Sequence, residues 1–129
     1  MIFERTPEVP QCVRADESKL RQVLINLLGN AIKFTQAGGA ILRVRTKQDK
    51  QEVSQSPPTT CTLHFEVEDT GPGIAASELE RLFKPFVQTE AGRKSHEGTG
   101  LGLTISQQFV RLMGGEIAVS TTLGHGTIF

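Results

Sequence analysis

The chain has 129 residues, the length of one domain with one sizeable hydrophobic core. Lysine plus arginine and aspartate plus glutamate both number 14, so the formal net charge is zero and no basic excess favours a nucleic-acid surface. No apolar run approaches the ~20 residues of a membrane span and no signal peptide is visible, so we expect a cytoplasmic domain that makes no membrane contact. Cys12 and Cys61 lack zinc-ligand spacing, which predicts two buried free thiols.

The first third of the chain predicts an edge strand followed by a long helix. Residues 2–5 and 11–14 alternate around two prolines, as an interrupted edge strand does. Asp16 is a candidate N-cap for a helix with its body over 19–35. Leucine, valine and alanine recur there every three or four residues and form a wide apolar face, and a Gly-Gly pair at 38–39 ends the unit.

The middle of the chain predicts two strands, a short helix and a lid. Alternation over 40–47 and over 62–68 predicts two strands, joined by an exposed polar loop at 48–60. Ser77 is a candidate cap for a short helix through residue 83, and the polar stretch at 84–97 is expected to be a mobile lid.

The last part of the chain predicts a helix over 101–113, a strand over 116–121 and a final strand that runs to residue 129. Strands and helices mix without regular βαβ alternation, which favours a two-layer α/β sandwich, a mixed sheet with helices packed on one face. We expect residues 1–129 to be a single domain, truncated at both ends relative to a longer parent chain.

Three glycines at every second position, Gly98, Gly100 and Gly102, lead directly into the helix predicted over 101–113. Glycine lets the backbone approach a ligand closely, and a helix N-terminus presents free N–H groups and the positive end of the helix dipole. The combination favours a phosphate group, although the same spacing also occurs in plain turns.

Asn26, Asn30 and Lys33 lie at positions i, i+4 and i+7 of the first helix and therefore form one narrow stripe away from its apolar face. A solvated polar face would explain this stripe. However, asparagine is a poor helix former, and amide oxygens suit a hard cation such as Mg²⁺, with Lys33 one turn further on as a partner for phosphate.

Asp69 follows an apolar strand, and its parity places it on the same face as Leu63, Phe65 and Val67, which should be the buried face. A buried carboxylate needs a partner. One reading is an Asx-turn in which Asp69 bonds its own loop. The other is that Asp69 accepts a hydrogen bond from an amino group on a planar ring such as adenine, beside a turn stripped of side chains at Gly71 and Gly73.

Five segments, taken in order, resemble the motifs of the catalytic ATP-binding domain of bacterial sensor histidine kinases. That domain belongs to a superfamily that also holds DNA gyrase B and the heat-shock chaperone ATPases. The segments resemble the N box, the first glycine box, the F box and the second and third glycine boxes. They are Asn26 to Phe34, Asp69 to Ile74, Leu82 to Phe86, Gly98 to Leu103 and Gly124 to Thr127.

The resemblance implies a Bergerat-type sandwich and a set of ATP contacts. Asn30 would hold Mg²⁺ with Asn26 beside it, and Lys33 would contact phosphate. Asp69 would bind the adenine amino group, helped by water and the Thr127 hydroxyl. The remaining implied contacts are Phe34, Gly71, Gly73 and Ile74 around the base and Gly98, Thr99, Gly100, Leu101, Gly102 and Leu103 around the phosphates. Gln88, Arg93 and Lys94 would lie in the lid.

The same resemblance favours phosphoryl transfer over ATP hydrolysis. ATP-hydrolysing relatives place a glutamate at the position of Asn26 to activate water, and an asparagine cannot act as that base. Transfer to a neutral imidazole depends mostly on positioning and charge neutralisation. Asn26 therefore favours transfer to a protein histidine, so the resemblance implies a protein histidine kinase of a two-component system.

The family's phosphoacceptor motif is absent from the chain. His96-Glu97 matches only its first two letters, and His64 and His125 are expected to be solvated. The implied partners are therefore the dimerisation and phosphoacceptor domain of the parent chain and, indirectly, a response regulator receiver domain.

Two alternatives stay open. Asp69-Thr70-Gly71 after an apolar strand also spells an aspartic protease signature, although Pro72-Gly73 fits it poorly and the helix stripe and glycine loop are left unexplained. A nucleotide-gated binding module that has lost transfer activity would keep every ATP contact and would differ only in activity.

Overall fold

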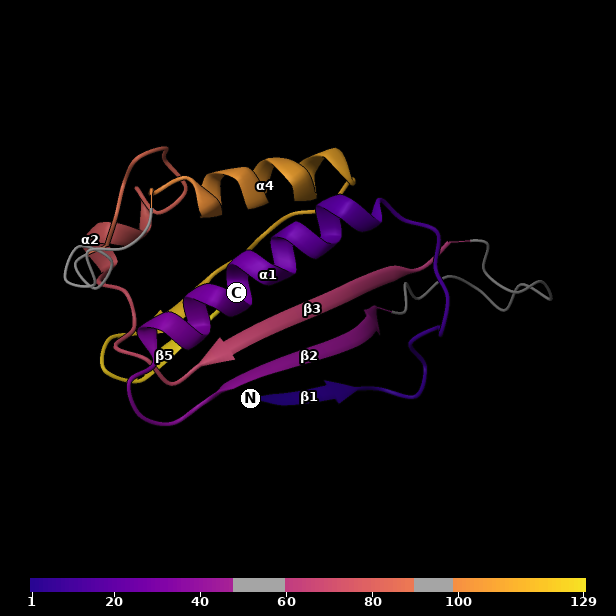
Figure 1. Ribbon diagram of the computed structural model, residues 1–129, viewed down its shortest axis with the longest axis horizontal. Helices are drawn as coiled ribbons and strands as arrows, with labels where there is room; N and C mark the ends of the chain where they lie inside the picture. Colours follow the sequence, from indigo (N-terminus) through magenta and orange to yellow (C-terminus); the bar gives the residue numbers. More distant parts are fainter. Residues whose placement is uncertain (48–59, 90–98) are drawn as a thin grey trace.

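The computed structural model describes residues 1–47, 60–89 and 99–129, in which a five-stranded sheet lies beneath helices packed on one of its faces (Figure 1). The sheet order is β1-β2-β3-β5-β4. β1 runs parallel to β2, and every other neighbouring pair is antiparallel. The strands are β1 (Ile2–Arg5), β2 (Ala40–Lys47), β3 (Thr62–Asp69), β4 (Ser120–Thr122) and β5 (Gly126–Ile128). The predicted two-layer sandwich with a mixed sheet is confirmed.

The helices are α1 (Glu17–Phe34), α2 (Ala76–Leu79) and α4 (Gly102–Leu112). α1 begins where the sequence predicts, because the Asp16 carboxylate accepts a hydrogen bond of 3.1 Å from the Lys19 backbone N–H. This bond satisfies one of the donors that a helix N-terminus leaves without an intrahelical partner. α4 packs beside α1 on the same side of the sheet (Figure 1).

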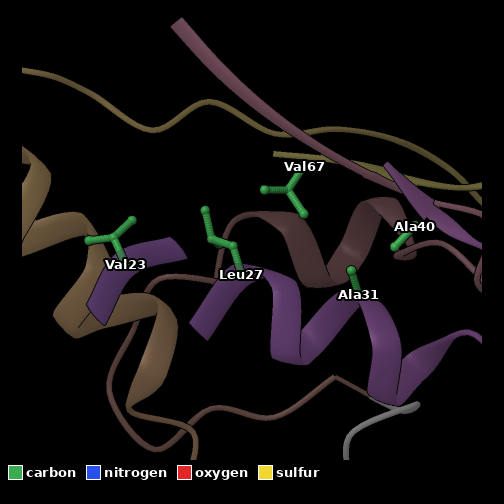
Figure 2. Close-up of a cluster of buried hydrophobic side chains, with 5 residues drawn as sticks. All are labelled: Val23, Leu27, Ala31, Ala40 and Val67. Carbon is green, nitrogen blue, oxygen red and sulfur yellow. The ribbon is translucent and has the colours of Figure 1, made fainter. Parts of the chain in front are cut away.

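The apolar face of α1 holds the two layers together. Val23, Leu27 and Ala31 recur at every fourth position and meet Ala40 of β2 and Val67 of β3 (Figure 2). All five residues are buried, and Val67 is only 1% exposed. Because residues four apart share a helix face, this contact fixes the rotation of α1 about its own axis.

The strand register places three polar residues in one row. Asp69 of β3 pairs with Thr127 of β5, and Thr127 pairs with Thr121 of β4. Side chains alternate between faces along a strand, so Asp69 shares the helix-covered face with the buried Val67. The parity argument for Asp69 is therefore confirmed, and the row lies at the end of the sheet beneath the C-terminal half of α1.

The opposite face of the sheet is polar and carries ion pairs between strands. Arg43 of β2 bonds Glu4 of β1 with 2.7 Å between Nε and Oε2, and it also pairs with Glu68 of β3. Arg45 and Glu66 form a further pair across β2 and β3 at 3.5 Å. One arginine thus links three neighbouring strands.

Three predicted elements are wrong in extent. The short helix predicted through residue 83 ends at Leu79. Its N-cap is Ala75, two residues before the predicted cap, so Ser77 lies inside the helix. The strand predicted over 116–121 is reduced to Ser120–Thr122, since β5 offers ladder partners to those three residues alone. Residues 11–14 form no strand, so the edge strand is Ile2–Arg5 by itself.

Cys12 and Cys61 are free, as expected, but both are exposed, so their predicted burial is wrong. They lie outside the elements that form the core. The predicted loop at 48–60 and the predicted lid at 84–97 fall mostly on residues outside the described ranges. Among the helices that the structure describes, none has the length and apolar character needed to cross a membrane.

We expect Leu27→Ala to lower the free energy of unfolding by about 3 kcal/mol, because it leaves a cavity between α1 and the sheet. Ile25→Ala is the matched control on the same helix, since Ile25 is 59% exposed, and it should change stability by less than about 0.5 kcal/mol. Urea unfolding followed by circular dichroism measures both. Equal losses in the two variants would contradict the packing assigned to α1.

Candidate functional site

A cleft of about 230 Å³ opens between α1, the row of Asp69 and Thr127, and the beginning of α4. It gathers most residues predicted for the site from segments far apart in the sequence. Those that line it are Asn26, Asn30, Lys33, Phe34, Asp69, Gly73, Ile74, Thr99, Gly100, Gly102, Leu103 and Thr127. Gly71 and Leu101 are not among the lining residues, and Gly98, Arg93 and Lys94 lie outside the described ranges.

The polar stripe of α1 faces this cleft. Asn26, Asn30 and Lys33 all line it, while Val23, Leu27 and Ala31 on the neighbouring face are buried against the sheet. The solvated-face explanation of the stripe therefore does not describe these three side chains. The burial of the apolar face dictates which way the polar stripe points.

Asn26 is held by α4. Its Nδ2 donates a hydrogen bond of 2.9 Å to Oγ of Ser106, whose side chain is buried at 1% exposure. A Cβ at Gly102 would lie 2.3 Å from Oδ1 of Asn26, so a residue with a side chain could not occupy this position without displacing the amide. Glycine at position 102 thus allows the first turn of α4 to pack directly on Asn26.

Asp69 is partly buried and accepts a hydrogen bond of 2.8 Å from the Gly71 backbone N–H. Burial raises the pKa of the Asp69 carboxyl above the ordinary value, because desolvation disfavours the charged form, and the nearby charge of Glu68 adds to the rise. Hydrogen bonds from the backbone N–H groups of Gly71 and Thr127 lower the pKa but do not cancel the effect of burial. The Asx-turn predicted for Asp69 is confirmed. The carboxylate also lines the cleft, and its contact with a planar ring stays a prediction.

Gly71 does not line the cleft but supports Asp69, which does. A Cβ there would lie 2.8 Å from Oδ1 of Asp69 and 3.1 Å from the carbonyl oxygen of Phe34. The residue is buried between these groups, and its N–H is the donor that fixes Asp69. Gly71 therefore shapes the site through its backbone, without lining the cleft itself.

Where α4 begins, the cleft has N–H donor character. Lys33 also lines the cleft, with its Nζ 5.2 Å from the centroid of the Phe34 ring. Leu101 is the N-cap of α4, and among the described residues no side chain makes a capping hydrogen bond to this helix. The N–H groups of its first turn, together with Gly100 and Gly102, are therefore positioned to bind an anion.

Several lining residues were not assigned to the site from sequence. The lining residues without a predicted role in the site are Pro72, Leu82, Val87, Thr89 and Phe129. Gln88, which the sequence placed only in the lid, also lines the cleft. Phe129 exchanges backbone hydrogen bonds of 2.8 and 2.9 Å with Val67, so strand parity could have placed it on the inner face. Ser106 could not be found in this way, because only the contact between α1 and α4 brings it to Asn26.

The described residues contain no group of three or more His, Cys, Asp or Glu side chains that could hold a metal ion. The cleft does offer the amide oxygens of Asn26 and Asn30 beside a site suited to phosphate. Mg²⁺ keeps several waters and commonly binds through one or two protein oxygens plus phosphate oxygens. The donor set therefore fits Mg²⁺ brought in with a nucleotide, and it does not fit a metal site made by the protein alone.

Comparisons with known proteins show the family. Residues 15–129 match the family described as histidine kinase-, DNA gyrase B-, and HSP90-like ATPase. The chain is 40% identical over 128 residues to the peroxide stress-activated histidine kinase mak2 of Schizosaccharomyces pombe, covering 98% of this chain and 5% of that protein. The chain thus spans a small part of this relative, and the resemblance is not confined to bacterial kinases.

Two solved structures are similar over nearly the whole chain. Full-length ShkA in complex with AMPPNP superposes with a TM-score of 0.75 at 37% identity, covering 99% of this chain and 24% of that one. The mycobacterial sensor histidine kinase MprB gives a TM-score of 0.70 at 30% identity, covering 98% of this chain and 79% of that one. With the family match over residues 15–129, these similarities show that the chain belongs to the histidine kinase-, DNA gyrase B- and HSP90-like ATPase family.

Proposed function

We propose that this chain binds Mg-ATP and transfers the γ-phosphoryl group to a histidine on a separate acceptor domain, as the catalytic domain of a two-component histidine kinase. The observation that carries the proposal is the polarity of the cleft. The Asp69 carboxylate and the Thr127 hydroxyl line the part built by the sheet, and Asn26 lies beside the first turn of α4, which no described side chain caps; Asn30 and Lys33 also line the cleft. A nucleotide has the matching polarity, with an amino-substituted base at one end and phosphates at the other.

The base would lie between Asp69, Thr127 and the apolar side chains of Phe34 and Ile74. The exocyclic amino group of adenine is a hydrogen-bond donor, and an ionised carboxylate only accepts. Gly73 also lines the cleft, and a Cβ there would lie 2.3 Å from the Thr122 carbonyl oxygen, so glycine lets this turn pack against β4 beside the base. Asp69, fixed by the Gly71 N–H, would therefore orient the base within the cleft.

The phosphates would lie against Lys33, Gly100, Gly102 and the first turn of α4. Mg²⁺ would be held by Asn30, with Asn26 beside it, and would neutralise charge on the phosphate oxygens. Asn26 is fixed by Ser106 and Gly102, so the phosphate end of the cleft is preorganised by α4. Preorganised donors and cations stabilise developing charge without reorganising during the reaction.

Transfer is favoured over hydrolysis by the residue at position 26. An amide cannot take a proton from water, and Asn26 makes its hydrogen bond to Ser106 through Nδ2. The imidazole of an acceptor histidine needs no such base, because a neutral ring nitrogen is already a nucleophile. Positioning by the cleft is then the main contribution of this chain to the reaction.

The remaining roles concern the whole protein. We place the dimerisation and phosphoacceptor domain in a parent chain and a response regulator receiver domain downstream of it. Relatives such as the hybrid signal transduction histidine kinase B of Dictyostelium discoideum support a multidomain parent, since the matched region is only 6% of that protein. Because the reaction draws on ATP, we propose that the domain works in the cytoplasm.

We expect Asp69→Asn to weaken ATP binding by at least about tenfold. The amide would present a donor where the adenine amino group also donates, which leaves polar groups unpaired in the cleft. Glu66→Gln is the matched control, because Glu66 lies on the outer face of β3 and pairs with Arg45. Calorimetry with Mg-ATP measures both variants, and equal affinities for Asp69→Asn and the unmodified chain would remove Asp69 from the base site.

The affinity for ATP should fall as the pH is lowered, beginning above the ordinary aspartate pKa of about 3.9. Burial raises the pKa of Asp69 in the free chain, and binding requires the ionised acceptor, so protonation competes with the nucleotide. Asp69→Asn lacks this titration and serves as the reference for protonation of the nucleotide itself. Parallel pH profiles of affinity in the two proteins would show that Asp69 does not titrate in contact with the base.

We expect Asn30→Ala to lower phosphoryl transfer to a separately supplied acceptor hairpin by about a hundredfold, because the metal and phosphate lose their protein ligand. Gln22→Ala is the matched amide control, since Gln22 is exposed on the same helix. Radiolabel that is labile in acid and stable in alkali identifies phosphohistidine on the hairpin. Brisk phosphate release from the chain alone, with no labelled hairpin, would move it among the ATP-hydrolysing members of the family.

A further inference from the structure

Behind the base end of the cleft, two threonine hydroxyls face each other across β4 and β5. Thr121 and Thr127 are register partners, and their Oγ1 atoms lie 3.0 Å apart. Thr127 lines the cleft and is 5% exposed, whereas Thr121 is not among the lining residues. Thr121 would therefore touch a bound nucleotide only through Thr127.

The hydrogen bonds of Thr121 account for every group on its hydroxyl. Its Oγ1 donates to the Gly126 carbonyl at 2.9 Å and accepts from the Ile74 backbone N–H at 2.9 Å. A hydroxyl has one proton and two acceptor lone pairs. The distance of 3.0 Å between the two hydroxyls allows either to donate. With its proton on Gly126, Thr121 has one lone pair left and accepts, and Thr127 is then the donor.

The direction of this bond decides what Thr127 offers to a ligand. Its proton points at Thr121, so its remaining lone pairs are directed to the cleft and it acts there as an acceptor. Its register partner Asp69 is also an acceptor when ionised, and it already accepts from the backbone N–H groups of Gly71 and Thr127, with further lone pairs left on its two oxygens. The base end of the cleft therefore presents two acceptors side by side.

We propose that Thr121 is a positioning residue that sets nucleotide specificity by holding the Thr127 hydroxyl as an acceptor, so that the cleft selects a 6-aminopurine over a 6-oxopurine. An exocyclic amino group carries two N–H donors and matches both acceptors. The carbonyl oxygen of a 6-oxopurine would face two acceptors with no donor between them, which leaves buried polar groups unpaired. This inference rests on the proposed binding of ATP and adds to it the residue that controls the choice of base.

The test compares the affinities of one protein for two probes, Mg-ATP and Mg-GTP, by calorimetry. Thr121→Val keeps the shape but removes the acceptor, so the Thr127 hydroxyl can turn its proton to the cleft. We expect the ATP-to-GTP affinity ratio to fall about tenfold, the worth of one hydrogen bond. Thr121→Ser restores the hydroxyl and should restore the ratio.

Thr122→Val is the control, because Thr122 is the neighbouring residue of β4 and its side chain is exposed. It should leave the ratio at the value of the unmodified chain. A ratio within one protein does not depend on the fraction of molecules that are folded, so a loss of stability cannot imitate the effect. If Thr121→Val does not fold, Thr121→Ala removes the same hydroxyl and is read in the same way.

A double-mutant cycle tests whether Thr121 acts through Thr127. In a Thr127→Val background, Thr121→Val should no longer change the ratio, because there is no hydroxyl left to orient. An unchanged ratio in Thr121→Val alone, or an equal change in both backgrounds, would overturn the assignment. If the unmodified chain binds neither nucleotide, the proposed function fails; if it binds ATP well and Thr121→Val keeps the full preference, only this inference fails.

Discussion

The packing of α1 on the sheet is the contact on which the rest of the site depends. Val23, Leu27 and Ala31 are buried against Ala40 and Val67, and this contact leaves the helix one rotational setting. The same setting turns Asn26, Asn30 and Lys33 to the cleft, since a residue's place on a helix is fixed by its position in the sequence. Burial of the apolar face of α1 thus also sets the direction of polar side chains outside the core. A rotation of α1 that exposed Leu27 would also move Asn30 away from the cleft.

The two ends of the cleft differ in chemistry because different elements build them. The sheet supplies acceptors through a row of residues held in register, and the helices supply amides, a cation and backbone N–H groups. Strand registry fixes the spacing of Asp69 and Thr127, while the packing of α4 on Asn26 fixes the geometry of the other end. A ligand that satisfies both ends of the cleft must span from Asp69 and Thr127 to the first turn of α4, which gives it a single orientation.

The sequence predicts what depends on local pattern. The N-cap at Asp16, the bounds of β2 and the buried parity of Asp69 follow from periodicity and side-chain chemistry, and the structure has all three. The short β4 could not be predicted, because its extent depends on a partner strand of three residues. The contact of Ser106 with Asn26 could not be found either, since it joins α1 and α4, which lie far apart in the chain. The same holds for the contact of Thr121 with the Ile74 N–H, while its contacts with Gly126 and Thr127 lie within one hairpin. The exposure of Cys12 and Cys61 could not be predicted for the same reason, because burial depends on how the segments that hold them pack against the rest of the chain.

The edge strand β1 is attached to the rest of the fold by fewer contacts than the strands beside it. All four of its side chains are exposed, β2 is its only partner among the described strands, and none of its residues belongs to the buried cluster beneath α1. Its ties are a short parallel ladder and the ion pair between Glu4 and Arg43, which water and salt weaken. Local opening of β1 is therefore separable from global unfolding, and a molecule that has transiently shed this strand still keeps α1 seated and its cleft intact.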